Sequence, residues 1–234
     1  MIWRLADHHH TFPDPMDAEP TGLLAVGGDL HPGRVLAAYR RGIFPWFSAG
    51  QPILWWSPDP RSVLDIRDFR VQRSLAKRVR QRPYTITLDT AFPEVVQACA
   101  SAPRPEQDGT WITPDMERCY TALHRAGHAH SVEAWRGDEL VGGLYGVVVG
   151  TMFCGESMFA RASDASKIGF VHLVRQLERW GFETVDCQMR TEHLARFGAR
   201  EIPRADFLQA LRGRSQQALR PGPWTFDQDF VCRG

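Results

Sequence analysis

Three strand-like segments that follow one another closely most constrain the fold of this chain. They cover residues 130–135, 139–149 and 151–159, and each is apolar and rich in residue types that favour strands. The glycine pair Gly142-Gly143 is predicted to interrupt the second segment. Together the segments predict a three-strand meander within a central sheet.

The segments around the meander carry helical and strand patterns from residue 63 onward. A strand is predicted from residue 63, with further strands at 84–88 and 184–189 and helices at 68–82, 92–100, 114–126, 165–180 and 193–197. This order is similar to the Gcn5-related N-acetyltransferase (GNAT) architecture, and residues 194–199 resemble its closing helix-to-turn segment. We therefore predict an α+β fold with a mixed, mostly antiparallel central sheet.

The first 61 residues have a different character. They are rich in Pro, Gly and aromatic residues, and only residues 31–41 carry a helical pattern. These features predict a small, irregular module packed by aromatic side chains. We therefore expect two domains, residues 1–62 and residues 63–234.

The composition sets limits on the partners of the chain. With 234 residues, of which 43% are hydrophobic and 24% charged, it is an ordinary soluble globular protein with a sizeable core. A formal net charge of +1 gives no general attraction to nucleic acid, so a polyanion must be bound by a local patch. The predicted helix 68–82 offers one, because Arg70, Arg73, Lys77 and Arg80 form a stripe on it. This stripe is either a polyanion-binding surface or an ordinary solvated helix face.

The five cysteines are odd in number and lack a CxxC spacing, which is typical of reduced thiols in a cytosolic protein. Cys154 and Cys187 are expected to point away from their polar neighbours, toward the other face of their strands. We find no export signal or membrane-spanning segment in the sequence. The sequence therefore predicts a cytoplasmic monomer that binds no metal.

Two polar interruptions of apolar strands mark a candidate site. Glu156 and Ser157 lie in the strand 151–159, and Asp186 and Gln188 lie in the strand 184–189. Burying such groups without partners costs about 1 to 3 kcal/mol each, so strands accept them mainly where a ligand or a hydrogen-bond network compensates. These residues are therefore either a functional site or ties between neighbouring loops.

Residues 159–167 argue against coenzyme A as an acyl donor. In Gcn5-related acetyltransferases the corresponding loop is rich in glycine, and its amides bind the pyrophosphate at a helix N-terminus. Here the glycines are missing and Asp164 adds a negative charge. Ser163 or Asp164 is expected to cap the following helix instead. We therefore expect a different acyl donor.

Long and unusual sequence motifs are spread over nearly the whole chain. They lie at residues 22–30, 38–47, 55–61, 109–113, 130–133, 140–146, 153–159, 165–167 and 186–188. Together they resemble the leucyl/phenylalanyl-tRNA-protein transferase family. The resemblance implies transfer of leucine or phenylalanine, and less well methionine, from aminoacyl-tRNA to the α-amino group of proteins that begin with Arg or Lys. Such proteins are then degraded by the N-degron pathway. The resemblance also implies an acetyltransferase-like domain that uses the tRNA 3′ end, with no cofactor.

The resemblance further implies roles for particular residues. An apolar pocket for the aminoacyl side chain is implied at Leu144, Phe153, Met158, Leu173, Leu177 and Val185. Trp111, Tyr39, Trp46 and Trp56 resemble surfaces that hold the terminal adenosine, and Tyr120 and Ser157 are further substrate-binding candidates. The basic stripe is then a tRNA-binding surface. At least half of the N-terminal aromatic residues are expected to be core packing.

Asp186, Gln188 and Glu156 are the catalytic candidates. Asp186 and Glu156 suit a cationic acceptor N-terminus, because a partly buried carboxylate pairs well with an ammonium group. Gln188 is expected on the same strand face as Asp186. Two mechanisms stay open, an Asp-Gln relay that acts as general base and a tRNA-assisted route. Two other functions also stay open: a coenzyme A-dependent amine N-acetyltransferase and a non-catalytic tRNA-binding protein.

Overall fold

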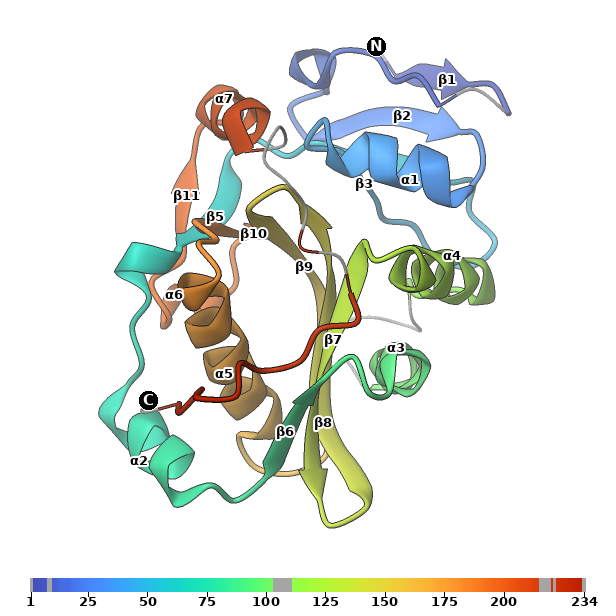
Figure 1. Cartoon of the computed structure of the whole chain (residues 1–234). Coiled ribbons are helices and arrows are strands. Elements are labelled where there is room, and N and C mark those ends of the chain that lie inside the picture. The colour runs from blue at the N-terminus through green and yellow to red at the C-terminus, as the bar shows by residue number, and fades with distance from the viewer. Residues whose placement is uncertain (1, 8–9, 103–110, 215–219, 221, 233–234) are drawn as a thin grey trace.

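The computed structural model describes the chain except for residues 1, 8–9, 103–110, 215–219, 221 and 233–234. Its strands form a four-stranded and a seven-stranded sheet (Figure 1). The four-stranded sheet has the order β1-β2-β4-β3 and belongs to the N-terminal part. The elements of this part are β1 (Trp3–Leu5), the 3-10 helix η1 (Pro15–Asp17), β2 (Leu23–Gly27), α1 (Pro32–Tyr39), β3 (Phe44–Pro45) and β4 (Leu54–Trp56).

The seven-stranded sheet is mixed and mostly antiparallel, as predicted. Its order is β11-β5-β10-β9-β8-β7-β6, and β9 runs parallel to β10 while the other neighbouring strands run antiparallel. The predicted meander is confirmed as β7-β8-β9. The strands are β5 (Arg61–Asp65), β6 (Thr85–Leu88), β7 (Ala129–Arg136), β8 (Glu139–Val149), β9 (Met152–Ala160), β10 (Thr184–Gln188) and β11 (Arg200–Ile202).

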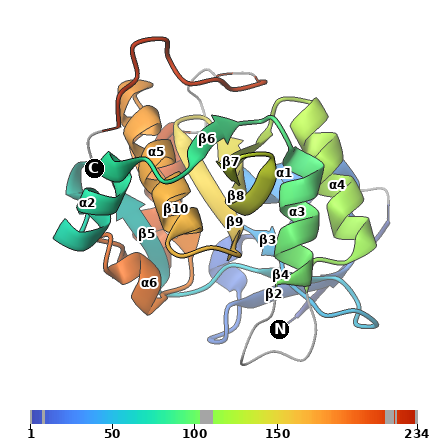
Figure 2. The ribbon, with the colours of Figure 1, turned by 90° about the horizontal axis from the view of Figure 1, so that it is seen from below.

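Helices cover both faces of the seven-stranded sheet (Figure 2). On one face α5 packs against β7, β8 and β9, and α2 packs against α5. On the other face α3 packs against the same three strands, and α4 lies beside it. The helices are α2 (Arg73–Gln81), α3 (Phe92–Ser101), α4 (Pro114–Arg125), α5 (Ala165–Arg179), α6 (Glu192–Ala195) and α7 (Arg204–Arg214). In the part of the chain that the structure describes, no helix is long and apolar enough to cross a membrane.

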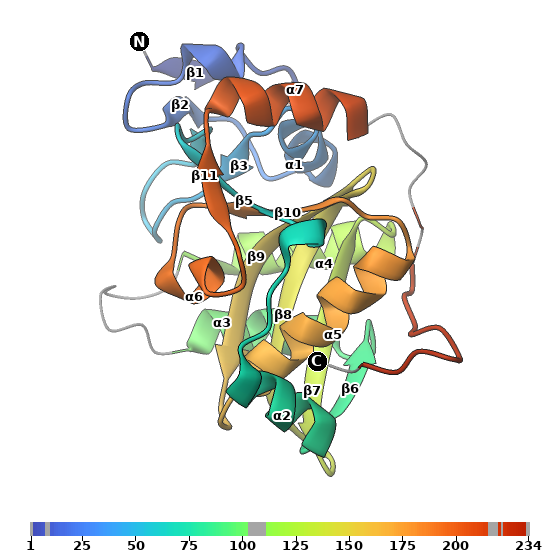
Figure 3. The same ribbon diagram turned by 90° about the vertical axis from the view of Figure 1, so that its left-hand side faces the viewer.

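Two hydrophobic cores hold these layers together. One lies between α5 and the sheet and contains Phe153 and Leu173. The other joins the N-terminal part to the large sheet, since Trp55 of β4 and Val147 of β8 both belong to it. The helix α7 lies against the N-terminal part (Figure 3) and adds Phe207 to this second core. The division of the chain at residue 62 stays a prediction.

The helix α2 begins at Arg73 and not at residue 68, where the sequence predicted its start. Phe69 explains the difference. Its buried ring stacks on that of Phe197 with a centroid distance of 5.6 Å, and the backbone N–H of Arg70 donates to the carbonyl oxygen of Phe197 at 2.9 Å. This tertiary anchor overrides the local helical pattern, so Arg70 lies outside the helix.

The strand β8 continues through Gly142 and Gly143, although the sequence predicted an interruption there. A Cβ atom at Gly142 would lie 2.6 Å from Cβ of Ala165 in α5, and one at Gly143 would lie 2.7 Å from the carbonyl oxygen of Val132 in β7. Both glycines are therefore positions of close packing within an intact strand.

The N-terminal sheet, β11 and α7 are also absent from the sequence prediction. The strands of the N-terminal sheet have between 2 and 5 residues, and β11 has 3. Segments this short do not show an alternating pattern that could identify them. The N-terminal part is thus more regular than expected.

Candidate functional site

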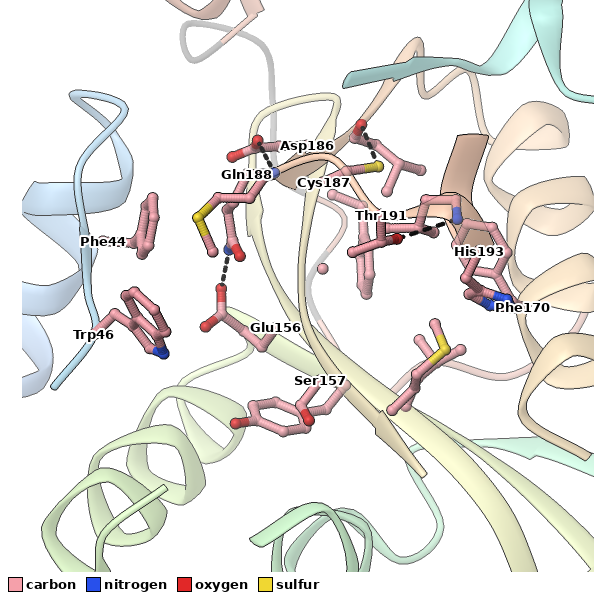
Figure 4. A pocket seen from close by; sticks show the side chains of 18 of the residues that line it. Phe44, Trp46, Glu156, Ser157, Phe170, Asp186, Cys187, Gln188, Thr191 and His193 are labelled. Atoms are coloured by element: carbon pink, nitrogen blue, oxygen red, sulfur yellow. Dashed lines mark hydrogen bonds between the residues drawn. The ribbon is translucent and has the colours of Figure 1, made fainter. Parts of the chain in front are cut away.

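A cavity of about 390 Å³ opens between the N-terminal part and the parallel strands β9 and β10 (Figure 4). Phe44 and Trp46 border it on one side, and Glu156 and Gln188 lie opposite them. The cavity is lined by Phe44, Pro45, Trp46, Trp111, Leu144, Tyr145, Phe153, Gly155, Glu156, Ser157, Met158, Phe170, Val185, Asp186, Cys187, Gln188, Met189, Thr191, His193 and Leu194.

A bulge in β9 places Glu156. Ser157 pairs with Tyr145 of β8. Gly155 pairs with the next residue, Gly146, so Glu156 is the extra residue of β9. A bulge locally disrupts the ladder and re-aims a side chain, here toward the cavity. Gly146 allows the strands to approach at this point, because a Cβ atom there would lie 2.3 Å from a backbone oxygen of β9.

A second bulge, in β10, places Gln188. Asp186 pairs with Val63 of β5. Gln188 pairs with Ser62, so Cys187 is the extra residue, and Gln188 itself has a left-handed φ of 60°. The sequence predicted a simple strand on which Asp186 and Gln188 share a face and Cys187 points away. The side chains of Asp186 and Cys187 do lie on different sides, since Cys187 belongs to the core beneath α5 and Asp186 pairs with Arg61. The strand is not simple, however, because the bulge brings all three residues to the cavity.

Glu156 is the centre of the hydrogen-bond network in the cavity. Its carboxylate accepts from the hydroxyl of Tyr120 at 2.7 Å and from Nε2 of Gln188 at 2.8 Å. The hydroxyls of Tyr120 and Tyr39 lie 2.8 Å apart. Burial raises the pKa of Glu156 to about 7, and the hydrogen bonds from Tyr39, Tyr120 and Gln188 offset part of this rise. A carboxyl with this pKa can take up and release a proton near neutral pH.

Asp186 lies in a buried ion pair with Arg61, a partner that the sequence analysis missed. The guanidinium donates to both carboxylate oxygens, at 2.8 and 2.7 Å, and both side chains are 1% exposed. The guanidinium also lies over the ring of Phe207, 4.5 Å from its centroid. The same carboxylate accepts from the backbone N–H of Gln188 at 2.9 Å. Asp186 therefore holds the β10 bulge in place, and its charge is balanced by Arg61.

The structure brings together four of the residues predicted to form an apolar pocket. Leu144, Phe153, Met158 and Val185 line the cavity, and Ser157 lies beside them. Leu173 and Leu177 do not line it; both are buried in the core beneath α5. The residue of α5 that reaches the cavity is Phe170, which the sequence analysis did not select. A helix presents only part of its apolar stripe to a given cavity, which explains the difference.

The predicted aromatic residues divide into two groups. Trp46 and Trp111 line the cavity. Tyr39, Trp56 and Tyr120 do not, but each supports a residue that does. The indole of Trp56 donates to the carbonyl oxygen of Trp46 at 2.7 Å. The hydroxyl of Tyr39 is hydrogen-bonded to that of Tyr120, which donates to the carboxylate of Glu156.

The predicted basic stripe lies away from the cavity. Arg73, Lys77 and Arg80 are exposed on α2, and Arg70 is exposed just before it. None of the four lines the cavity. The helix α2 packs against α5, so the stripe is on the sheet face opposite α3 and α4.

A second, smaller cavity of about 110 Å³ lies between α2 and the main cavity. It is lined in part by Arg78, Lys167 and Arg196. His193 lines both cavities, and its pKa is lowered by burial and by the charges of Lys167 and Arg196. The sequence analysis missed this basic group because its members come from α2, α5 and the segment around α6.

The two cysteines beside the site do not have the properties of nucleophiles. Cys154 and Cys187 are buried, and burial raises the pKa of both thiols. A nucleophilic cysteine needs the opposite shift, because the thiolate is the reactive form.

Comparisons with known proteins agree on one family. The family model described as "Leucyl/phenylalanyl-tRNA protein transferase" matches residues 63–212. A second family model, described as "Leucyl/phenylalanyl-tRNA protein transferase N-terminal domain", matches residues 28–59. A protein named leucyl/phenylalanyl-tRNA–protein transferase from Nitratidesulfovibrio vulgaris is 55% identical over 98% of both chains. Its counterpart from Nitrosospira multiformis is 59% identical over 91% of both chains. Solved structures are more distant: L-PGS from Bacillus licheniformis aligns with 74% of this chain and 57% of its own, at 12% identity and a TM-score of 0.39.

Proposed function

Because the chain belongs to the leucyl/phenylalanyl-tRNA-protein transferase family, we propose that it transfers a leucyl or phenylalanyl group, and less well a methionyl group, from aminoacyl-tRNA to a protein whose first residue is Arg or Lys. The acceptor is the α-amino group of that residue. The new N-terminal residue marks the product protein for degradation by the N-degron pathway. One observation carries the proposal: an apolar cavity contains a half-buried carboxyl group whose pKa is about 7.

The apolar side of the cavity suits the aminoacyl side chain. Leu144, Phe153 and Met158 offer it a lining without charge, and the volume of about 390 Å³ is within the range of small-ligand sites. One methylene in such a pocket is worth about 1 to 3 kcal/mol, so leucyl, phenylalanyl and methionyl groups overlap as substrates. Trp46 and Trp111 supply surfaces on which the terminal adenine can stack.

The network around Glu156 suits the chemical step. The acceptor amine loses a proton, its nitrogen bonds to the ester carbonyl carbon, and the ribose oxygen leaves with a proton. We assign the first proton transfer to ionised Glu156, which also attracts the acceptor ammonium. Gln188 orients the ester carbonyl. Asp186 holds Gln188 in place, because its own charge is already paired with Arg61.

The tRNA requires a cationic surface outside the cavity. We propose that Arg70, Arg73, Lys77 and Arg80 bind its phosphates, since contacts of this kind position a nucleic acid without reading its sequence. None of the five cysteines forms a disulfide and four are buried, which supports a reducing compartment, and we propose a cytoplasmic monomer that uses no cofactor.

Coenzyme A is a poorer fit as donor. The residue before α5, Asp164, has a left-handed φ of 59°, and its carboxylate accepts from Nζ of Lys167 at 2.8 Å. Its side chain makes no cap hydrogen bond to the helix. A carboxylate at this helix N-terminus repels the pyrophosphate that the amides would otherwise attract.

One assay tests the proposal and both alternatives. The protein is incubated with radiolabelled Leu-tRNA and a peptide that begins with Arg, and the peptide N-terminus is sequenced. We expect a new Leu-Arg bond and no acetylation of the same peptide by acetyl-coenzyme A. Binding of Leu-tRNA with the ester left intact would favour the non-catalytic tRNA-binding protein, and acetyl transfer would favour the acetyltransferase.

A further inference from the structure

Residues 222–232, near the C-terminus, cross the face of the sheet that carries α5 (Figures 1 and 3). We call residues 222–232 the C-terminal strap. It begins beyond residue 212, where the family match ends. The sequence analysis gave it no role.

One anchor of the strap is Trp224, which is 2% exposed. Its ring stacks on that of His130 in β7, with a centroid distance of 3.6 Å and an interplanar angle of 2°. Asp89 joins the pair, because one carboxylate oxygen accepts from the backbone N–H of Trp224 at 2.6 Å and lies 2.7 Å from Nδ1 of His130. The indole N–H donates to the carbonyl oxygen of Arg220 at 3.0 Å. These contacts fix the position of the indole.

A second anchor ties the strap to the end of α5. The carboxylate of Asp227 accepts from Nε2 of Gln176 at 2.8 Å and from the indole N–H of Trp180 at 2.9 Å. The backbone N–H of Asp227 donates back to Oε1 of Gln176, which is fully buried. Further along, Phe226 stacks on Phe230 at 4.8 Å. The strap is thus held at two points, Trp224 and Asp227.

Trp224 also reaches the cavity wall. Its ring centroid lies 6.3 Å from that of Phe153, which lines the cavity. The ring of Phe153 lies directly against β8, because a Cβ atom at Gly146 would be 2.5 Å from its Cζ. Phe153 is therefore held between the backbone of β8 and the indole of the strap. The position of this ring sets how deep the apolar side of the cavity is.

We propose that Trp224 is a positioning residue that sets the depth of the aminoacyl cavity through Phe153, and thereby the balance between leucyl and larger aminoacyl groups. The inference rests on the proposed function. Removing the indole leaves space into which Phe153 can move, since a core relaxes toward a new cavity. The deeper cavity then accepts phenylalanyl groups better than leucyl groups.

The test compares Trp224→Leu with Phe226→Leu, which shortens a strap residue that is not in contact with Phe153. For each protein, kcat/KM is measured with Leu-tRNA and with Phe-tRNA at a fixed acceptor peptide. We expect Trp224→Leu to raise the phenylalanyl-to-leucyl ratio about fivefold or more, less than the full effect of a direct pocket change. Phe226→Leu is expected to leave the ratio within about twofold of the wild type, because it does not alter the wall.

Thermal unfolding separates this effect from a loss of stability. If Trp224→Leu does not fold, Trp224→Phe supplies a smaller change in the same direction. An unchanged ratio in a folded Trp224 variant, or an equal change in Phe226→Leu, would overturn the inference. The wild-type protein tests the proposed function separately, because absence of any leucyl transfer by it would refute the function before the strap is considered.

Discussion

At the residue scale, the candidate site places two carboxyl groups in different environments. Asp186 is paired with Arg61 through two hydrogen bonds, whereas Glu156 accepts from neutral donors, among them Tyr120 and Gln188. Burial raises the pKa of Glu156 to about 7, because these hydrogen bonds offset the desolvation of its charge only in part. This difference assigns proton transfer to Glu156 and a structural task to Asp186 in the proposed mechanism.

The pKa of Glu156 predicts how the transfer rate depends on pH. Below pH 7 the carboxyl group is protonated and cannot accept the proton of the amine, so the single-turnover rate at saturating substrates is expected to fall about tenfold per pH unit. Above pH 7 the rate levels off. Glu156→Gln is expected to slow transfer at pH 8 by about a hundredfold or more and to remove this pH-dependent limb. If the rate of Glu156→Gln still fell below pH 7, a group other than Glu156 would be responsible for the pH dependence.

The ion pair of Asp186 predicts a large effect on stability. Arg61→Met leaves a buried carboxylate without its cation, so the free energy of unfolding is expected to fall by about 3 to 5 kcal/mol. The double variant Arg61→Met, Asp186→Leu removes both charges and is expected to recover most of this loss. Urea denaturation measures the free energy of unfolding of the single and of the double variant. If the free energy of unfolding of the single variant fell by less than about 1 kcal/mol, Arg61 and Asp186 would not act as a buried ion pair, since surface ion pairs contribute that little.

At the element scale, the site depends on two bulges and on the close approach of α5 to β8. The bulges place Glu156 and Gln188, and Gly142 of β8 allows α5 to approach the sheet closely. The meander and α5 could be predicted, because their apolar patterns are long. The bulges could not, because a bulge depends on a register between strands that one strand's sequence does not contain.

Gly142→Ala tests the close approach of α5 to β8. The added Cβ would lie 2.6 Å from Cβ of Ala165 and 2.9 Å from the backbone nitrogen of Ser166, so something must shift. We expect a loss of about 1 to 3 kcal/mol in the free energy of unfolding. Gly213→Ala in α7 is the matched control. Apart from its chain neighbours and its own helix, no atom of the described residues lies within 4 Å of its Cβ position. Alanine favours a helix, so a gain of up to about 1 kcal/mol is expected.

At the scale of the whole molecule, contacts between distant parts of the chain assemble the site. Arg61 and Asp186 are 125 residues apart, and Trp46 faces Glu156 from the N-terminal part. Local patterns identified Glu156, Asp186 and Gln188 as polar residues in apolar strands, but they do not specify such partners. This explains why Arg61, Phe170 and the strap were missed.

The charge of the whole molecule makes the basic stripe testable. The net charge is only +1, so the affinity for tRNA must come from local cations. Each phosphate contact that is lost is expected to lower the slope of log K against log salt by about 0.7 to 0.9. The variant Arg73→Glu should therefore bind Leu-tRNA more weakly and with a shallower salt dependence.

Arg125→Glu is the control for this measurement, because Arg125 is exposed on α4, on the other face of the sheet. It removes a cation of the same kind but leaves the stripe intact. Filter binding at a series of salt concentrations gives both the affinity and the slope. If the two proteins lose affinity equally, with equal slopes, the attraction depends on total charge and the stripe is an ordinary solvated face. A loss confined to the α2 variant assigns the tRNA to the α5 side of the sheet, where the small basic cavity shares the lining residue His193 with the candidate site.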